Sequence, residues 1–213
     1  MGIERYLFFW AGGIFVTSVD AAVTRALESV GAGCPGLTLD PSYKRIKEDV
    51  LLGRSGAKEF YENISALCPA GAKSIDLEEE ITGNLVVDQG ASGCLTAVKE
   101  GLRLWLIADL PKPWFWGIPA IDTLTSRFPA DHILFPQDCG LNNMIPDIFE
   151  LILRTSRGEK DECLVLDPDL KRAVASINWR LPATVIIDPS RLEREFLLRR
   201  LIDREYRVHS RPI

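Results

Sequence analysis

The stretch that decides the fold runs from residue 133 to residue 187 and reads ILFPQDCGLNNMIPDIFELILRTSRGEKDECLVLDPDLKRAVASINWRLPATVII. Three short apolar runs within it are typical of strands buried on both faces of a parallel sheet: Ile133–Phe135, Cys163–Leu166 and Val185–Ile187. Between successive runs, apolar residues recur at the spacing of one face of a helix. Strands that alternate with helices of this length predict an open α/β sheet with right-handed crossovers.

Acidic residues follow two of these strands. Asp138 lies in the loop after Ile133–Phe135, and Asp167 follows Cys163–Leu166 directly. Ligands of open α/β sheets bind at the carboxyl ends of the strands. We therefore expect a functional site of this chain to lie beside these acids.

Two further strands are predicted nearer the N-terminus. Tyr6–Trp10 is a fully apolar run that breaks into a turn containing Gly12 and Gly13. Leu104–Ala108 is a second apolar run, and Asp109 follows it. Paired glycines serve either the close approach of a ligand to the backbone or a tight turn with positive φ, and the sequence leaves both readings open.

Residues 19–87 carry little strand signal. Four segments within this region have the amphipathic spacing of helices, namely residues 20–29, 41–52, 57–67 and 76–82. We therefore predict two parts. Residues 1–18 and 88–213 form a Rossmann-like α/β core, and residues 19–87 form a small helical cap lobe inserted after the first strand.

Composition excludes several classes of partner. The formal net charge of −5 argues against nucleic acid or an anionic membrane surface. Five scattered cysteines without a CxxC pair fit the reduced thiols of a cytoplasmic protein better than a disulfide or zinc framework. The apolar run at residues 7–16 is too short to span a membrane, and it lacks the basic leader of a signal peptide.

The order of these features resembles the haloacid dehalogenase-like (HAD-like) hydrolase superfamily. Four segments carry the resemblance, and in chain order they read RYLFFWAGGIFV, RLWLIADLP, GLNNMIPDIFELIL and ECLVLDPDLKRAVASINW. They are similar to the family's nucleophile strand, its strand ending in Ser or Thr, its lysine segment and its segment of metal-binding acids. The predicted helical lobe lies where the family carries a cap. The resemblance covers nearly the whole chain and implies a HAD-like fold.

The catalytic positions that the resemblance implies carry other residues. The aspartate nucleophile, which forms a covalent intermediate in the family, is expected at Trp10, and the Ser/Thr position at Ala108. The motif lysine is expected at Asn143. Of the acids that would hold Mg²⁺, Asp167 is retained, but its usual acidic neighbour is Pro168. Asp167 alone would bind Mg²⁺ weakly, so the resemblance implies a degraded active site.

Several of these residues also have a purely structural reading. Asp167 has the position of a helix N-cap, and Asp109 is a common turn former. Trp114 and Trp116 lie with Pro111 and Pro113 in the loop predicted after the second strand, at the rim of the expected pocket. There the two tryptophans either pack in the core, line an apolar pocket or anchor a partner. Cys139 is the one nucleophile to nominate nearby, and nothing in the sequence would lower the pKa of its thiol.

Two classes of function compete. The first is a non-catalytic HAD-like binding, regulatory or assembly module, in which Trp10 fills the space of the nucleophile. Its expected ligand-binding residues are Trp10, Gly12, Gly13, Asp109, Trp114 and Trp116. The second is a divergent phosphatase- or dehalogenase-like hydrolase that uses Asp167 and the nearby acids Asp138 and Asp109.

The first class is favoured because the residue that is lost is the one that bonds to substrate in the family. The expected partner is an apolar small molecule or another protein, and a homo-oligomer is compatible with the sequence. No cofactor is expected, since Mg²⁺ is poorly supported by the retained acids.

Overall fold

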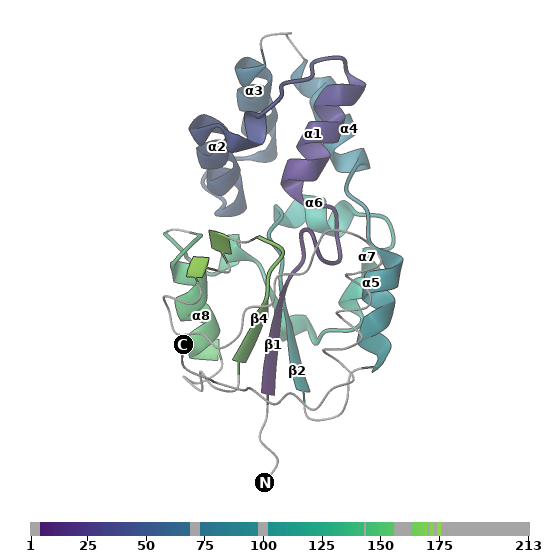
Figure 1. Cartoon of the computed structure of the whole chain (residues 1–213), viewed down its shortest axis with the longest axis vertical. Coiled ribbons are helices and arrows are strands. Elements are labelled where there is room, and N and C mark those ends of the chain that lie inside the picture. The colour runs from purple at the N-terminus through teal and green to yellow at the C-terminus, as the bar shows by residue number, and fades with distance from the viewer. Residues whose placement is uncertain are drawn as a thin grey trace.

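A computed structural model describes residues 5–68, 73–97, 102–142, 144–155, 163–169, 171–172 and 174–175 of the chain. The predicted strand Val185–Ile187 and the motif position Asn143 lie outside these residues. The described residues form an α/β core with a helical lobe above it (Figure 1).

The core is built on a four-stranded parallel sheet. Its strands are β1 (Arg5–Trp10), β2 (Leu102–Ile107), β3 (Ile133–Leu134) and β4 (Cys163–Leu166), in the order β3-β2-β1-β4. All three strand pairs are parallel. The predicted α/β sheet is therefore confirmed. Two strands end one residue earlier than predicted, because Ala108 follows β2 and Phe135 leads into the next turn.

Helices and short 3₁₀ turns flank the sheet. They are α5 (Gln89–Cys94), η2 (Leu95–Ala97), α6 (Lys112–Gly117), α7 (Ile121–Thr125), η3 (Ala130–His132), η4 (Pro136–Asp138) and α8 (Asp147–Thr155). In Figure 1, α8 lies on one side of the strands, and α5 and α7 lie on the other.

One segment differs from the sequence-based expectation. The loop predicted around Trp114 and Trp116 is the short helix α6, because Pro113 occupies its first turn and Phe115 N donates to Pro111 O at 3.0 Å. Proline disrupts a helix interior but favours a helix start, so Pro113 is compatible both with a loop and with the first turn of a helix.

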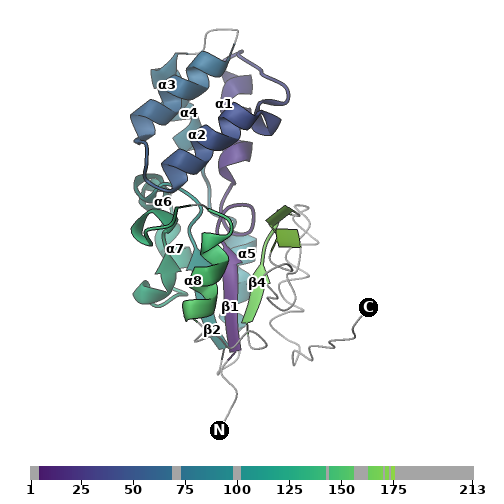
Figure 2. The same cartoon turned by 90° about the vertical axis from the view of Figure 1, so that its left-hand side faces the viewer.

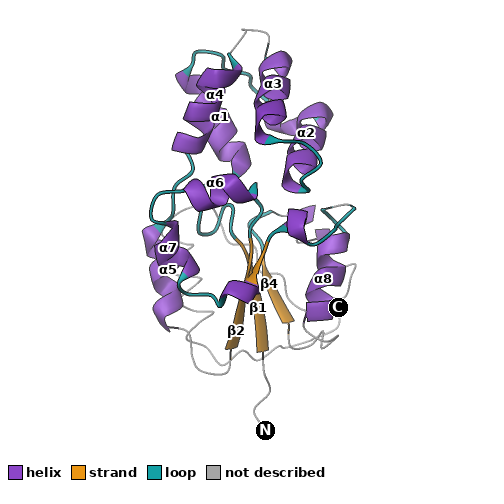
Figure 3. Ribbon diagram, turned by 180° about the vertical axis from the view of Figure 1, so that it is seen from behind, coloured by secondary structure: helices purple, strands orange, loops and turns teal. Residues whose placement is uncertain are grey.

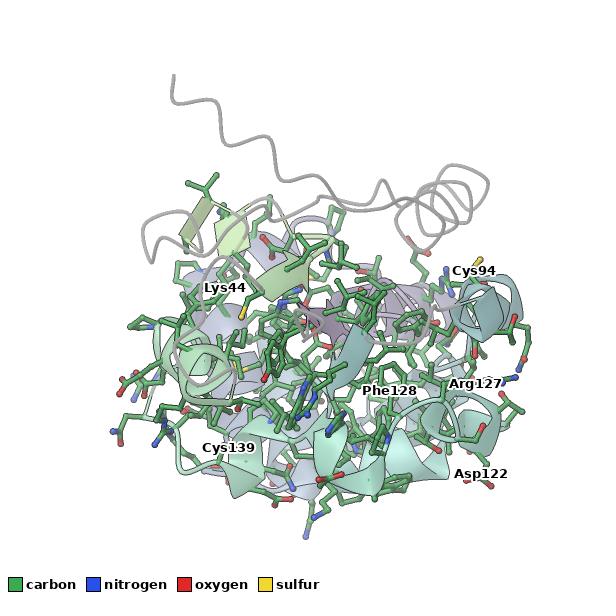
Figure 4. All side chains as sticks on the ribbon, turned by 90° about the horizontal axis from the view of Figure 1, so that it is seen from below. Lys44, Cys94, Asp122, Arg127, Phe128 and Cys139 are labelled. Carbon is green, nitrogen blue, oxygen red and sulfur yellow. The ribbon has the colours of Figure 1, made fainter. Side chains whose placement is uncertain are left out.

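The core is closed by aromatic packing around β1. The rings of Phe9, Phe15 and Phe128 lie 5.3–6.4 Å apart in tilted or edge-on contacts. Viewed from below, Phe128 lies within the body of the core, whereas Asp122 and Arg127 lie at its rim (Figure 4). Such pairs add to the stability that comes from burial alone.

The helical lobe comprises α1 (Val19–Ser29), η1 (Leu37–Leu39), α2 (Pro41–Leu51), α3 (Ala57–Leu67) and α4 (Ser74–Gly83). Side-chain caps begin two of its helices: Ser18 Oγ accepts from Ala21 N, and Asp40 Oδ1 accepts from Ser42 N. The lobe lies above the carboxyl ends of the strands in two perpendicular views (Figures 1 and 2).

The two linkers to the lobe run side by side. Thr17 N donates to Val86 O at 3.0 Å, Asp88 N donates to Phe15 O at 2.7 Å, and an antiparallel bridge joins Val16 to Val87. The chain therefore leaves and re-enters the core at one place. Among the described residues, no helix is both long and apolar enough to cross a bilayer.

Candidate functional site

Three residues meet at the carboxyl ends of neighbouring strands. Trp10 is the last residue of β1, Asp109 follows β2 by two residues, and Asp167 follows β4 directly. Because β1 lies between β2 and β4, the parallel register brings these ends to the same edge of the sheet. All three are buried, and Trp10 and Asp167 are 0% exposed.

Asp109 is held by the glycine turn that follows β1. Gly12 N donates to Asp109 Oδ1 at 2.6 Å. A Cβ at Gly12 would lie 2.8 Å from that same oxygen, so no larger side chain fits without displacing the carboxylate. Gly13 adopts a φ of 84°, which favours glycine. The positive φ of Gly13 agrees with the tight turn, and the group that approaches the backbone at Gly12 is the protein's own carboxylate, not a ligand.

Arg172 connects the two acids. Its Nη2 lies 2.9 Å from Asp167 Oδ1, its Nε lies 3.0 Å from both oxygens of Asp167, and its Nη1 lies 3.2 Å from Asp109 Oδ2. Asp169 N also donates to Asp167 Oδ1 at 2.8 Å. The planar guanidinium matches two carboxylates in a way that a single ammonium group could not.

Trp10 forms the floor of this arrangement. The Cζ of Arg172 lies 4.0 Å from the centroid of the Trp10 ring, which is a close cation–π contact. The indole Nε1 has no hydrogen-bond partner in the described part of the chain. Trp10 therefore fills space and supports Arg172 with its π-face, and it presents no surface to solvent.

Burial and mutual attraction oppose each other in this cluster. Burial raises the pKa of Asp167 to about 6, against the lowering effect of Arg172 and of the Asp169 N–H. Burial likewise raises the pKa of Asp109, against Arg172 and the Gly12 N–H. Burial lowers the pKa of Arg172, but the adjacent carboxylates Asp109 and Asp167 outweigh it and raise that pKa. The guanidinium is therefore permanently charged, and the cluster of two acids and one base titrates through its acids.

Comparison with known proteins identifies the fold. No protein-family model and no curated protein sequence matches the chain. Among solved structures, a predicted HAD-like family hydrolase from Porphyromonas gingivalis matches with a TM-score of 0.68 at 19% identity, over 95% of this chain and 100% of that one. The chain has a HAD-like fold.

Other HAD-like structures agree. A HAD family enzyme from Bacteroides thetaiotaomicron, solved with magnesium and inorganic phosphate, matches with a TM-score of 0.60 at 11% identity, over 89% of this chain and 96% of that one. An L-2-haloacid dehalogenase matches with a TM-score of 0.58 at 16% identity, over 90% and 87% of the two chains. The fold expected from the four sequence segments is therefore confirmed.

The residues present do not fit the magnesium ion that a HAD-like fold implies. Mg²⁺ requires oxygen ligands in near-octahedral geometry. The oxygens of Asp109 and Asp167 already accept hydrogen bonds from Arg172 and from backbone N–H groups. No group of three or more metal-binding side chains occurs within the described ranges. A positively charged guanidinium between the two acids would also repel a divalent cation.

The other predicted site residues lie in different surroundings. Ala108 is buried, and its N donates to Leu134 O at 2.8 Å, so it extends the sheet pairing and has no hydroxyl to offer. Trp114 packs against Phe60 and Tyr61 of α3. Trp116 is 45% exposed. The structure thus gives each tryptophan its own environment and builds no common lining from Trp10, Trp114 and Trp116.

The acid and thiol after β3 have local partners. Asp138 accepts from Lys112 Nζ at 2.6 Å on the surface. The Cys139 thiol donates to Phe135 O at 3.1 Å, and burial raises its pKa, with Asp138 adding to the effect. A raised pKa reduces the thiolate fraction, so Cys139 is not an activated nucleophile. In the sheet order, β2 separates β3 from β1, so these residues stand apart from the Trp10 cluster.

Arg172 is a site residue that the sequence alone does not predict. The only available signal was a basic residue five positions after Asp167, in a segment with helical periodicity. That spacing does not place two side chains on one face of a regular helix. Its second partner, Asp109, lies 63 positions away and becomes a neighbour only once the sheet is assembled.

Proposed function

We propose that this chain is a non-catalytic HAD-like protein, retained as a binding or regulatory module. One observation carries the proposal: the guanidinium of Arg172 spans the carboxylates of Asp109 and Asp167 while its Cζ lies 4.0 Å from the centroid of the Trp10 ring. The groups that could perform chemistry at this edge of the sheet are already engaged with one another.

The first support is the residue at the end of β1. A covalent nucleophile needs a lone pair that it can donate to the substrate. The indole of Trp10 has none to offer, and its ring is fully enclosed. The four segments that resemble the HAD-like family place the aspartate nucleophile at this position.

The second support is charge compensation. The neighbour from Bacteroides thetaiotaomicron was solved with magnesium and inorganic phosphate, a cation and an anion. In this chain Arg172 is a tethered cation, and Asp109 is a tethered anion held by the Gly12 N–H. We infer that the Arg172 guanidinium takes the place of the metal cation and the Asp109 carboxylate that of the phosphate anion. The site is then filled by the protein's own side chains.

The partner is then sought outside this cluster. We propose an apolar small molecule or another protein, and we assign the helical lobe to the role of a cap inserted between residues 18 and 88. A cytoplasmic setting agrees with the five cysteines, none of which forms a disulfide in the structure.

A second candidate has one specific observation in its favour. Burial raises the pKa of Asp167 to about 6, which is close to the value that suits a general acid or base at neutral pH. A divergent hydrolase could use Asp167 in that role if Arg172 moved away. The non-catalytic reading is preferred because Asp167 is 0% exposed and no activated nucleophile lies beside it in the part of the chain that the structure describes.

Turnover assays separate the two candidates. The substrates are an aryl phosphate and a 2-haloacid, each with Mg²⁺, for the wild type, Trp10→Asp and Asp167→Asn. Trp116→Asp is a matched control because the same change is made at a half-exposed tryptophan. We expect no turnover by any of the four proteins. Trp10→Asp alone should not restore activity, since its carboxylate would be buried beside two other acids.

Two results would contradict the non-catalytic proposal. Wild-type turnover that disappears in Asp167→Asn would establish the divergent hydrolase. Turnover by Trp10→Asp, but not by Trp116→Asp, would mean that the remaining site residues still support catalysis. Circular dichroism of each variant shows whether an inactive protein is also folded.

A further inference from the structure

Within the described ranges, two sets of contacts join the helical lobe to the core in addition to its linkers. One contact is aromatic and joins α3 to α6; we call it the aromatic wedge, and it consists of Trp114, Phe60 and Tyr61. The other is polar and joins the α2–α3 region to the loop after β3. We call it the polar latch, and it consists of Glu48, Arg54, Asn142 and Met144.

In the aromatic wedge, a core residue completes the inner face of a lobe helix. The Trp114 ring lies 5.2 Å from the Phe60 ring in an edge-on contact and 5.5 Å from the Tyr61 ring in a stacked one. Trp114 is 6% exposed and its two partners are at most 1% exposed. Figure 3 shows α6 directly beneath the lobe. Separation of lobe and core would expose all three rings to water, which is unfavourable.

In the polar latch, two lobe side chains bind backbone groups of the core. Glu48 Oε1 accepts from Met144 N at 2.9 Å, and Arg54 donates to the carbonyl oxygen of Asn142. Lobe and core also approach each other closely here, because a Cβ added at Gly53 would lie 3.1 Å from Gln137 Cβ. Gly53 has a φ of 72°, so both its conformation and its close contact favour glycine.

The two contacts share one support. Lys112 N, at the start of α6, donates to Gln137 Oε1 at 3.2 Å, and Lys112 Nζ lies 2.6 Å from Asp138 Oδ2. The helix that carries Trp114 is therefore tied to the loop that meets Gly53. Rotation of the lobe about its paired linkers would have to break the wedge and the latch together.

We propose that the lobe is locked closed over the carboxyl ends of β1, β2 and β4 by the aromatic wedge and the polar latch. A hydrolase must open such a lobe to exchange substrate and product. The locked lobe makes the cluster around Trp10 a fixed part of the interior. This inference concerns access and does not rest on the loss of catalysis. Turnover would overturn the proposed function, whereas lobe motion would overturn the lock.

The test is a distance measurement across the lobe and the core. Spin labels are introduced as non-canonical amino acids at Leu39 in η1 and Asp122 in α7, both of which are exposed, and electron–electron resonance gives the distance distribution. The variants are Trp114→Ala, which removes the wedge, and Arg54→Ala combined with Glu48→Ala, which removes the latch. Trp116→Ala is the matched control, two residues along the same helix and 45% exposed.

We expect one narrow distribution in the wild type and in Trp116→Ala, and a second, longer population in Trp114→Ala and in the latch variant. A wild type with two populations would overturn the proposal, and so would wedge and latch variants that both keep the single narrow distribution. If Trp114→Ala does not fold, as judged by circular dichroism, the latch variant still decides, because its substitutions lie at partly exposed positions.

Discussion

The guanidinium of Arg172 lies over the indole ring of Trp10, with 4.0 Å between Arg172 Cζ and the ring centroid. The edge of the same guanidinium faces Asp109 and Asp167. Arg172 thus combines a cation–π contact with two ion pairs, and a guanidinium can make both kinds of contact. The side chain is only 17% exposed.

Replacing Arg172 should destabilise the protein strongly. Arg172→Met keeps the apolar contact with Trp10 but leaves two buried carboxylates without their cation. The expected loss in the free energy of unfolding is about 3–5 kcal/mol, the usual effect of removing one partner of a buried ion pair. Urea denaturation measures it. Lys171→Met is the matched control, since it removes the same charge from the neighbouring exposed residue and should change stability by about 0.5 kcal/mol or less. Equal losses in the two variants would refute a special role for Arg172.

Divalent cations should bind only after Arg172 is removed. In the wild type, neither Mg²⁺ nor a chelator should shift the thermal midpoint. In Arg172→Ala, the guanidinium no longer lies between Asp109 and Asp167, and Mg²⁺ should raise the midpoint. At a concentration one hundred times the Kd, the gain would be about 2.7 kcal/mol. Isothermal titration calorimetry gives the stoichiometry, with Lys171→Ala as the control. Binding of Mg²⁺ to the wild type would contradict this prediction, because it would show that the ion displaces Arg172 from Asp109 and Asp167.

Gly12 should tolerate no side chain. In Gly12→Ala the new Cβ would lie 2.8 Å and 3.0 Å from the two oxygens of Asp109, which would push the carboxylate away from Arg172. We expect a loss of about 1–3 kcal/mol, as for other overpacked buried sites. Gly33→Ala is the control, because no atom lies within 4 Å of its added Cβ. Thermal unfolding of the two variants makes the comparison, and a Gly12→Ala protein as stable as Gly33→Ala would contradict the geometry.

The pH dependence of stability should carry the signature of Asp167. Burial raises its pKa to about 6 in the folded protein, whereas the unfolded carboxyl has its ordinary value of about 4. The folded state therefore binds this proton more tightly. Its contribution to stability is greatest below about pH 4 and is lost as the pH rises through about 6. Two pKa units correspond to about 3 kcal/mol.

The measurement compares the wild type with Asp167→Asn by urea denaturation between pH 4 and pH 7. As the pH rises, the unfolding free energy of the wild type should fall relative to that of Asp167→Asn by up to about 3 kcal/mol. The reason is that Asp167 loses its proton over this range, whereas asparagine does not titrate. Arg172, Asp109 and Asp169 surround the group in both proteins. Asp122→Asn, at an exposed position, is the control and should follow the wild type. A pH-independent difference for Asp167→Asn would contradict the raised pKa.

Most of the core could be predicted from the sequence because its strands are buried on both faces. Tyr6–Trp10 and Cys163–Leu166 read as unbroken apolar runs, and the structure buries every residue of both. The helix α6 could not be predicted in the same way. Pro111 and Pro113 indicate a loop when the sequence is read alone, and only the conformation shows that they begin a helix.

The site could be predicted in part. The positions of Trp10, Asp109 and Asp167 at one edge of the sheet follow from strand order, since parallel strands end together. The engagement of these residues by Arg172 could not be predicted. It depends on the path of the chain after β4, and charge pairing between distant segments leaves no periodic trace in the sequence.

The paired linkers at Val16 and Val87 bear on how the chain folds. Arg5 must find Leu102 to begin the β1–β2 pairing, a search over about 100 residues whose entropic cost grows with the logarithm of loop length. Once the bridge between Val16 and Val87 has formed, the residues of the lobe no longer add to the length of the loop between Arg5 and Leu102. A loop of about 30 residues then remains to be closed. The entropic cost of closing this loop is thereby lower by about 1 kcal/mol. Early folding of the inserted lobe would therefore lower the entropic cost of pairing β1 with β2. It would also accelerate assembly of a sheet whose strands are otherwise distant in sequence.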